Sequence, residues 1–180
     1  IKNKKIYFSE SNCKSYLPNW RKINYAISSS AKIKYGGGVL LDLSHEIDYL
    51  SWIFGKFNIL FSYNKKKSNL KINTDDTLTI INIFKKNILC NLTMNYYTRK
   101  SLRQIIIDGE KISIIADLIS NKLTYYLNNK KYELIYNNIN RDSTQILMHK
   151  NILKSQNVLC ANFKEGINTM KVINEVNQSR

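Results

Sequence analysis

One segment constrains the fold more than any other part of the chain: GGGVLLDLSHEIDYLSWIFG, residues 36–55. It begins with three consecutive glycines and ends with another glycine. Between them, apolar residues recur at three- and four-residue spacings, which is typical of a helix with one apolar stripe. These residues are Leu40, Leu41, Leu43, Ile47, Leu50, Ile53 and Phe54. The segment therefore predicts a helix over residues 38–54 that follows a glycine turn and packs on the core.

The polar residues of this predicted helix include Asp42, His45 and Glu46. Spacings of three and four residues place side chains on one part of a helical face. A carboxylate beside an imidazole fixes its tautomer and raises its basicity, as proton transfer requires. The simpler interpretation is a solvated helix edge. The glycines favour a functional role, because they let the backbone approach a neighbouring element or a ligand, and free N–H groups at a helix start suit an anionic or hydroxyl-rich ligand.

The segment resembles the glycine-rich motif and following helix in the C-terminal domain of Gfo/Idh/MocA-type oxidoreductases, NAD(P)-dependent enzymes that mostly act on sugars and sugar derivatives. The resemblance extends upstream to residues 16–21, 25 and 30–31, and downstream to residues 74–76, 96–99 and 105–109. It implies that His45 is the catalytic acid/base and that Asp42 is its catalytic partner. Asp42 and His45 are three residues apart, where many members have four, so Glu46 is the alternative partner.

Residues 16–25 form an irregular stretch that contains the only proline, together with Trp20, Arg21 and Tyr25. Aromatic rings can stack on a sugar, and an arginine can pair with a carboxylate or phosphate. The alternative is that these aromatic residues only pin the loop to the domain. We take as candidate substrate-binding residues Trp20, Arg21, Tyr25, Gly36, Gly37 and Glu46.

No nucleotide-binding domain is recognisable in residues 1–180. The chain has neither a G-x-G-x-x-G turn after a strand nor the family's Glu-Lys-Pro motif, and Gly36, Gly37 and Gly38 lack the required spacing. The chain begins with Ile1, so we expect a piece of a longer polypeptide or a mature fragment. Residues 1–180 are interpreted as a single C-terminal substrate-binding and dimerisation domain without its N-terminal Rossmann domain. The full-length enzyme is expected to use NAD or NADP, whereas this chain alone is expected to bind neither and to be inactive.

Composition excludes several function classes. The formal charge is +15, which could indicate a nucleic-acid-binding protein. However, the lysines are scattered, and A/T-rich codons explain the abundance of Lys, Asn, Ile and Tyr. No nucleic-acid recognition motif is visible, so we expect no nucleic-acid partner. Cys13, Cys90 and Cys160 are odd in number and far apart, which favours a reducing cytoplasm without disulfides or a metal site. No apolar run is long enough for a membrane span.

The rest of the chain reads as strands and then helices. Alternating or β-rich runs separated by short turns predict strands at residues 6–9, 57–63, 77–84, 88–97, 103–107, 111–117, 123–127 and 132–136. Two helices follow, one capped by Asp142 or Ser143 and one over residues 162–176 that buries Ile167, Met170, Ile173 and Val176. His149 is expected at the surface. The fold class is α+β, a predominantly antiparallel open-faced sheet with helices on one face. The resemblance implies a homo-oligomer through the open face.

Two functional hypotheses remain. The first is the substrate-binding half of an oxidoreductase for a sugar or sugar-nucleotide derivative. The Leu-Ser-His-Glu form of the motif is similar to that of members from surface-polysaccharide pathways. This similarity indicates a nucleotide sugar or a nonulosonate precursor as the substrate. The second is a non-catalytic binding or scaffold protein that retains the sheet. An upstream reading frame with a G-x-G-x-x-G turn would favour the first hypothesis.

Overall fold

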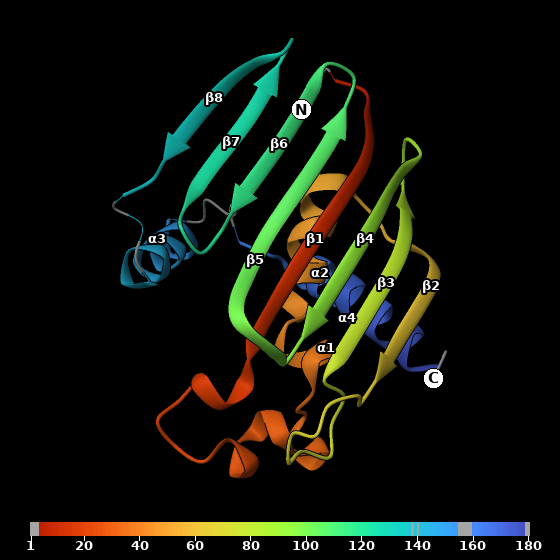
Figure 1. The fold of residues 1–180 in the computed structure, drawn as a ribbon, viewed down its shortest axis with the longest axis vertical. Helices are drawn as coiled ribbons and strands as arrows, with labels where there is room; N and C mark the ends of the chain where they lie inside the picture. The colour runs from red at the N-terminus through yellow and green to blue at the C-terminus, as the bar shows by residue number, and fades with distance from the viewer. Residues whose placement is uncertain (1–3, 138, 140, 155–159, 179–180) are drawn as a thin grey trace.

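The computed structural model describes residues 4–137, 139, 141–154 and 160–178. Within them, one sheet of eight strands has the order β2-β3-β4-β1-β5-β6-β7-β8 (Figure 1). The strands are β1 (Ile6–Tyr16), β2 (Asn58–Lys65), β3 (Thr77–Phe84), β4 (Ile88–Asn95), β5 (Tyr97–Gly109), β6 (Ile112–Asp117), β7 (Lys122–Leu127) and β8 (Lys130–Ile135). All the strand runs predicted from the sequence are present, with shifted ends.

The sheet is mixed, which refines the expected topology. Strand β1 runs parallel to β4 and antiparallel to β5, while the other neighbouring strands pair antiparallel. The parallel pair arises because the chain leaves β1, forms the helical segment and the edge hairpin β2–β3, and only then returns as β4 beside β1. A parallel pair needs such a long crossover.

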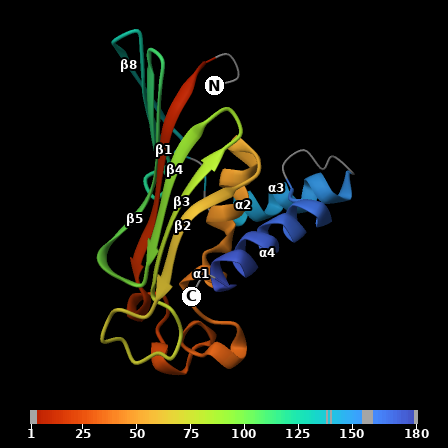
Figure 2. The same ribbon diagram turned by 90° about the vertical axis from the view of Figure 1, so that its right-hand side faces the viewer.

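The helices lie on one side of the sheet (Figure 2). They are α1 (Val39–Asp42), α2 (Ser44–Phe54), α3 (Arg141–Leu153) and α4 (Phe163–Gln178), with short 3-10 turns η1 (Leu17–Asn19), η2 (Tyr25–Ile27), η3 (Ser29–Ala31) and η4 (Ile33–Tyr35). Helix α2 packs beside α4, and both contribute to the core that covers β3, β4 and β1. The other face of the sheet has no helix among the described residues.

Strand β1 is longer than predicted because its polar residues are satisfied inside the domain. Ser9 Oγ donates to the carbonyl of Ile106 at 3.1 Å, and Ser11 Oγ lies 2.9 Å from Tyr49 Oη, within hydrogen-bond distance. Both serines are fully buried. A polar run can therefore occupy a central strand.

The helix predicted over residues 38–54 is interrupted, so that prediction was wrong in one respect. Leu43 has φ −107° and ψ 20°, outside the helical region, and it separates α1 from α2. Residues before and after this break do not follow one 3.6-residue spiral. Asp42 consequently ends α1, whereas His45 belongs to α2.

The C-terminal helices also differ from expectation. In α4 the residues Thr169, Val172, Ile173 and Val176 are buried, while Ile167 and Met170 are exposed. The predicted face was wrong because a helix turns about 100° per residue, so positions 167 and 176 lie half a turn apart. Helix α3 lies on the same side of the sheet, but its described side chains are mostly exposed. His149 is exposed on α3, as predicted.

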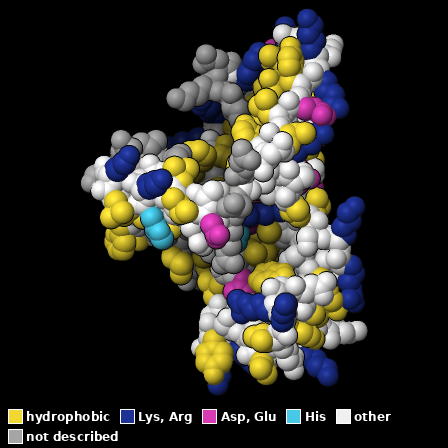
Figure 3. All heavy atoms as spheres, turned by 90° about the vertical axis from the view of Figure 1, so that its left-hand side faces the viewer, with side chains coloured by type: hydrophobic (Ala, Val, Ile, Leu, Met, Phe, Trp, Pro, Cys, Tyr) yellow, Lys and Arg dark blue, Asp and Glu magenta, His cyan; other side chains and the backbone are white. Residues whose placement is uncertain are grey.

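Three further features concern the arguments made from composition about membrane spans, cysteines and charge. None of the described helices is long and apolar enough to cross a membrane. The three cysteines are free thiols, and Cys13 and Cys90 are buried. Figure 3 shows Lys and Arg side chains as separate spots along one side of the molecule, without a single large basic patch there.

Candidate functional site

The glycine turn packs tightly against its own neighbours. A Cβ atom on Gly37 would lie 2.2 Å from the carbonyl oxygen of Ser29, and one on Gly38 would lie 2.5 Å from Asp75 Oδ1. Gly38 also has φ 117°, a conformation that residues with a side chain rarely adopt. Of the two alternatives for this motif, the structure therefore displays the close approach to a neighbouring element.

The start of α1 is occupied by the same chain. The backbone N–H of Leu40 donates to Asp75 Oδ2 at 3.0 Å, and that of Val39 donates to the Asp75 carbonyl at 3.1 Å. These are the donors that a ligand at the helix start would need. The expected anion site at this helix start is therefore filled by Asp75.

Glu46, in the first turn of α2, is the centre of a polar network. Its side chain is completely buried. Its Oε1 accepts from Arg103 Nε at 2.8 Å and lies 2.8 Å from Arg103 Nη2, while Oε2 accepts from the Tyr49 hydroxyl. His45 Nε2 lies 3.2 Å from the same Oε1. One carboxylate thus joins α2, β5 and, through Tyr49 and Ser11, β1.

The network keeps Glu46 ionised. Burial by itself would raise the pKa of the Glu46 carboxyl, but hydrogen bonds with His45 and Tyr49 and the charge of Arg103 outweigh it, and the pKa lies below its usual range. Burial and the Glu46 charge raise the pKa of Tyr49, so the phenol stays protonated and donates. Burial also raises the pKa of the nearby Cys13 thiol to about 12, so this cysteine is not a nucleophile at neutral pH.

His45 and Asp42 have separate surroundings. The His45 side chain is half exposed, at 50%, and in the described part of the chain its ion-pair contact is with Glu46. Asp42 Oδ2 instead accepts from the Tyr96 hydroxyl at 2.6 Å. The structure brings the imidazole together with the alternative partner, Glu46, and not with Asp42.

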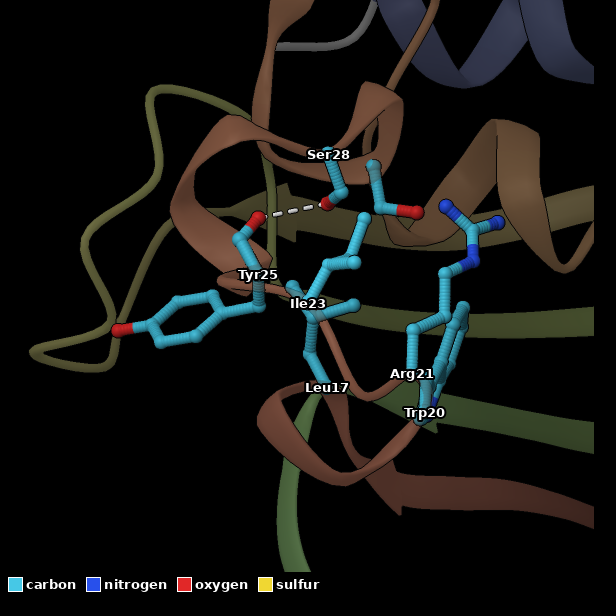
Figure 4. A pocket seen from close by; sticks show the side chains of 7 residues that line it. Leu17, Trp20, Arg21, Ile23, Tyr25 and Ser28 are labelled. Carbon is cyan, nitrogen blue, oxygen red and sulfur yellow. Dashed lines mark hydrogen bonds between the residues drawn. The ribbon is translucent and has the colours of Figure 1, made fainter.

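The predicted substrate residues of the N-terminal loop are only partly gathered. Trp20, Arg21 and Tyr25 all line one small pocket, together with Leu17, Ile23, Ser28 and Ser30, but the Tyr25 ring points away from Arg21 (Figure 4). The Tyr25 hydroxyl accepts from the backbone N–H of Lys71 at 3.0 Å. The pocket volume is about 10 Å³, room for one water at most. In this structure the pocket admits no sugar.

A chain of contacts connects this loop to α1. Trp20 Nε1 donates to Ser15 Oγ at 2.9 Å, and its ring meets the edge of Tyr96 with centroids 5.3 Å apart. Tyr96 in turn holds Asp42. Trp20 therefore does pin the loop, as one of the two interpretations predicted, and Arg21 is exposed beside it.

Sequence reasoning missed Arg103, Tyr49, Tyr96 and Asp75. The contact of Tyr49 with Glu46 could have been predicted, because Tyr49 lies three residues after Glu46 on the same helix. Arg103 lies on β5 and Tyr96 at the junction of β4 and β5, each more than fifty residues from its partner, and no local spacing signals them. Asp75 belongs to a segment that was noted only for its resemblance.

A larger groove of about 760 Å³ lies elsewhere, between α2 and α4. Its lining includes Trp52, Lys56, Cys160, Glu165, Lys171 and Glu175, and none of the predicted site residues. Among the residues the structure describes, no group of three or more His, Cys, Asp or Glu side chains could hold a metal ion.

Comparisons with known proteins agree on the fold. The family described as "Oxidoreductase family, C-terminal alpha/beta domain" matches residues 5–180. No curated protein matches the chain. Solved structures that are similar include levoglucosan dehydrogenase in complex with NADH and levoglucosan, with 14% identity, a TM-score of 0.81, and 97% of this chain and 56% of that chain covered.

Two others are dehydrogenases whose descriptions name a UDP-sugar. UDP-N-acetylglucosamine 3-dehydrogenase GnnA from Acidithiobacillus ferrooxidans has 12% identity and a TM-score of 0.74, over 97% of this chain and 53% of that one. The WlbA dehydrogenase from Bordetella pertussis, in complex with NADH and UDP-GlcNAcA, has 17% identity and a TM-score of 0.70, over 99% and 53%. The chain spans little more than half the length of these structures.

Proposed function

This chain belongs to the Gfo/Idh/MocA oxidoreductase family, and from that premise we propose that it is the substrate-binding half of an NAD(P)-dependent oxidoreductase acting on a sugar or sugar-nucleotide derivative. The observation that carries the proposal is the half-exposed His45 imidazole held against a buried, ionised Glu46. Such a group can take or give the proton of a substrate hydroxyl. The site lies on the domain that the family places beside the substrate.

In this proposal His45 is the acid/base and Glu46 its partner. Asp42 lies one turn away and acts on the site through its bond with Tyr96. Glu46 itself has no exposed surface for a direct substrate contact, so its predicted substrate-binding role becomes an indirect one. Trp20 and Arg21 stay in the proposal as substrate-contact residues, because Arg21 is exposed and Trp20 contacts Tyr96, which binds Asp42.

The glycine turn and the helix start of this chain do not offer a site for the cofactor phosphates. A Cβ atom on Gly37 would meet backbone oxygens, Gly38 lies against the Asp75 side chain, and the N–H groups at the start of α1 are bonded to Asp75. We propose that the cofactor, NAD or NADP, is held by a nucleotide-binding half corresponding to the part of the similar structures that this chain does not cover. This chain would supply proton transfer and substrate positioning.

The substrate class is proposed from the relatives. Levoglucosan is the sugar in one similar structure, and UDP-GlcNAcA is the sugar nucleotide in another. The test is an assay of the full-length polypeptide that carries this domain, with free sugars and UDP-sugars and with NAD or NADP, followed by cofactor absorbance. Cofactor reduction with at least one of these sugars supports the proposal. Inactivity with all of them, in a folded protein, favours the non-catalytic scaffold.

We also propose that the chain forms a homo-oligomer through the open sheet face. Phe61 pairs with Ile81, and Leu89 lies on the same side of the sheet; these side chains are 54%, 36% and 40% exposed. On this face Asn91 Oδ1 is buried without a hydrogen-bond partner among the described residues. Apolar surface and an unpaired buried acceptor are both expected where a partner is missing.

Sedimentation of the 180-residue chain tests this interface. The unmodified chain is expected to form a dimer or larger assembly, and Leu89→Lys to reduce the mass to that of a monomer. Trp52→Lys is the matched control, because Trp52 is 66% exposed on the helical side and should leave the mass unchanged. A monomeric unmodified chain at all concentrations would contradict the proposal.

A further inference from the structure

Arg103 connects the sheet to the candidate acid/base. It lies on β5 opposite Cys13 of β1, on the side of the sheet that faces the helices. From there its guanidinium reaches Glu46, with Nε and Nη2 each 2.8 Å from Oε1. Two donors of a rigid planar group converge on one oxygen, which fixes the position of the carboxylate more firmly than a single point contact would.

The position of the carboxylate determines the proton on His45. An ionised carboxylate can only accept hydrogen bonds, and Glu46 Oε1 lies 3.2 Å from His45 Nε2. A neutral imidazole carries one proton, on either nitrogen. Because a lone pair on Nε2 would face the negative oxygen, the proton is favoured on Nε2, and Nδ1 is left as the acceptor.

We propose that Arg103, acting through Glu46, is a positioning residue that holds neutral His45 in its Nε2–H tautomer and leaves Nδ1 as the nitrogen that exchanges the substrate proton. Arg103 itself touches neither the reacting atoms nor His45 in this account. The part about substrate rests on the proposed function, whereas the tautomer is a property of this chain alone.

Asp42 does not perform this task in the structure. Its Oδ2 is bonded to Tyr96, and in the described residues it makes no ion pair with His45. Tyr49 contributes on the other side of Glu46, where it donates to Oε2 and leaves Oε1 to Arg103 and His45. Three side chains thus divide the carboxylate between them: Tyr49 binds one oxygen, and Arg103 and His45 share the other.

The tautomer is measurable directly, because the chain has only two histidines. Nitrogen-15 spectra of the labelled 180-residue chain at about pH 9, where an ordinary imidazole is neutral, report which nitrogen carries the proton. His45 is expected to show a roughly tenfold or greater excess of Nε2–H, the size that a bond to a charged group supports. His149, exposed on α3, is the internal reference for a ring without such a partner.

Two variants assign the effect to Arg103. Arg103→Met should reduce the Nε2–H excess of His45 by about tenfold, toward the ratio of His149, because the carboxylate is no longer held. Arg103→Lys keeps the charge but offers a single point donor, so it should fold and give an intermediate excess. Lys122→Met is the control, since Lys122 pairs with the distant, exposed Glu133 and should change neither ring.

The outcomes separate this inference from the proposed function. An unmodified chain with its His45 proton on Nδ1, or an unchanged ratio in folded Arg103→Lys and Arg103→Met, would overturn the positioning role. If Arg103→Met does not fold, the tautomer ratios of the unmodified chain and of Arg103→Lys still test the positioning role. The spectra need neither substrate nor cofactor, so a His45 without catalytic function would leave the tautomer result standing.

Discussion

The Tyr96 hydroxyl donates to Asp42 Oδ2 at 2.6 Å and thereby ties helix α1 to the junction between β4 and β5. Tyr96 is completely buried, and the edge of its ring meets Trp20. Burial and the Asp42 carboxylate raise the pKa of the phenol, so it remains a donor at any physiological pH. This one tyrosine joins the N-terminal loop, the helix and the sheet at the place where a substrate is proposed to bind.

Removal of that hydroxyl should cost stability. We expect Tyr96→Phe to lower the free energy of unfolding by about 1–3 kcal/mol, because a hydrogen bond to a charged group is lost while the ring contact with Trp20 is kept. Urea titration measures the change. Tyr97→Phe is the adjacent control: Tyr97 is 37% exposed, and its hydroxyl makes only a 3.3 Å contact with Thr77 Oγ1. Equal losses in the two variants would contradict the role given to Tyr96.

We expect any replacement of Gly37 by a residue with a side chain to destabilise the domain. A methyl group there would meet two backbone carbonyls, at 2.2 Å from Ser29 and 2.6 Å from Ser30, so the loop would have to move. We expect Gly37→Ala to destabilise the chain by roughly 1–3 kcal/mol. Gly166→Ala in α4 provides the contrast, because nothing lies within 4 Å of its Cβ position and helix propensity favours alanine by about 0.8–1 kcal/mol. Thermal unfolding of both variants tests the difference in sign.

The sequence predicted the turn, the helical region after it and the succession of strands along the chain, but not their order in the sheet, because the former depend on local spacing. Glycines and alternating residues act over a few positions. The break at Leu43 and the partners of Glu46 could not be predicted in the same way. Arg103 lies 57 positions from Glu46, and only the completed sheet brings it under α2. The spacing of Asp42 and His45 departs from the one common in the family, and in the structure His45 contacts the alternative partner, Glu46.

Acid should destabilise the domain partly through Asp76. Burial would raise the pKa of this buried carboxyl, but hydrogen bonds from the Ser68 side chain, the backbone N–H groups of Lys67 and Ser68, and Thr77 lower it below its ordinary value of 3.8. A lowered folded-state pKa gives stability that is complete above the unfolded value and is lost as pH falls below it. The urea midpoint should therefore decrease below about pH 4.

Asp76→Asn isolates this contribution. The amide cannot accept on both sides as the carboxylate does, so the variant should be less stable at pH 7 and should lose less stability between about pH 4 and pH 2. Urea midpoints of the two proteins across this range give the comparison. Parallel curves would show that Asp76 contributes nothing to acid sensitivity.

The chain alone is expected to show no saturable binding of NADH or NADPH at micromolar concentration. The donors at the start of α1 are bonded to Asp75, and Gly37 and Gly38 are packed against Ser29 and Asp75. Energy transfer from Trp20 and Trp52 to the reduced cofactor is the measurement. A saturable signal would mean that this chain contains a cofactor site.

Turnover of His45→Ala in the full-length polypeptide that carries this domain tests the central claim most directly. General acid/base groups contribute about a hundredfold to ten-thousandfold, so we expect kcat to decrease by that order while KM changes much less. His149→Ala is the control: His149 is exposed on α3, so this variant should have the turnover of the unmodified polypeptide. If His45→Ala retained the unmodified turnover across the pH range, His45 would be a solvated helix residue and the acid/base assignment would be wrong.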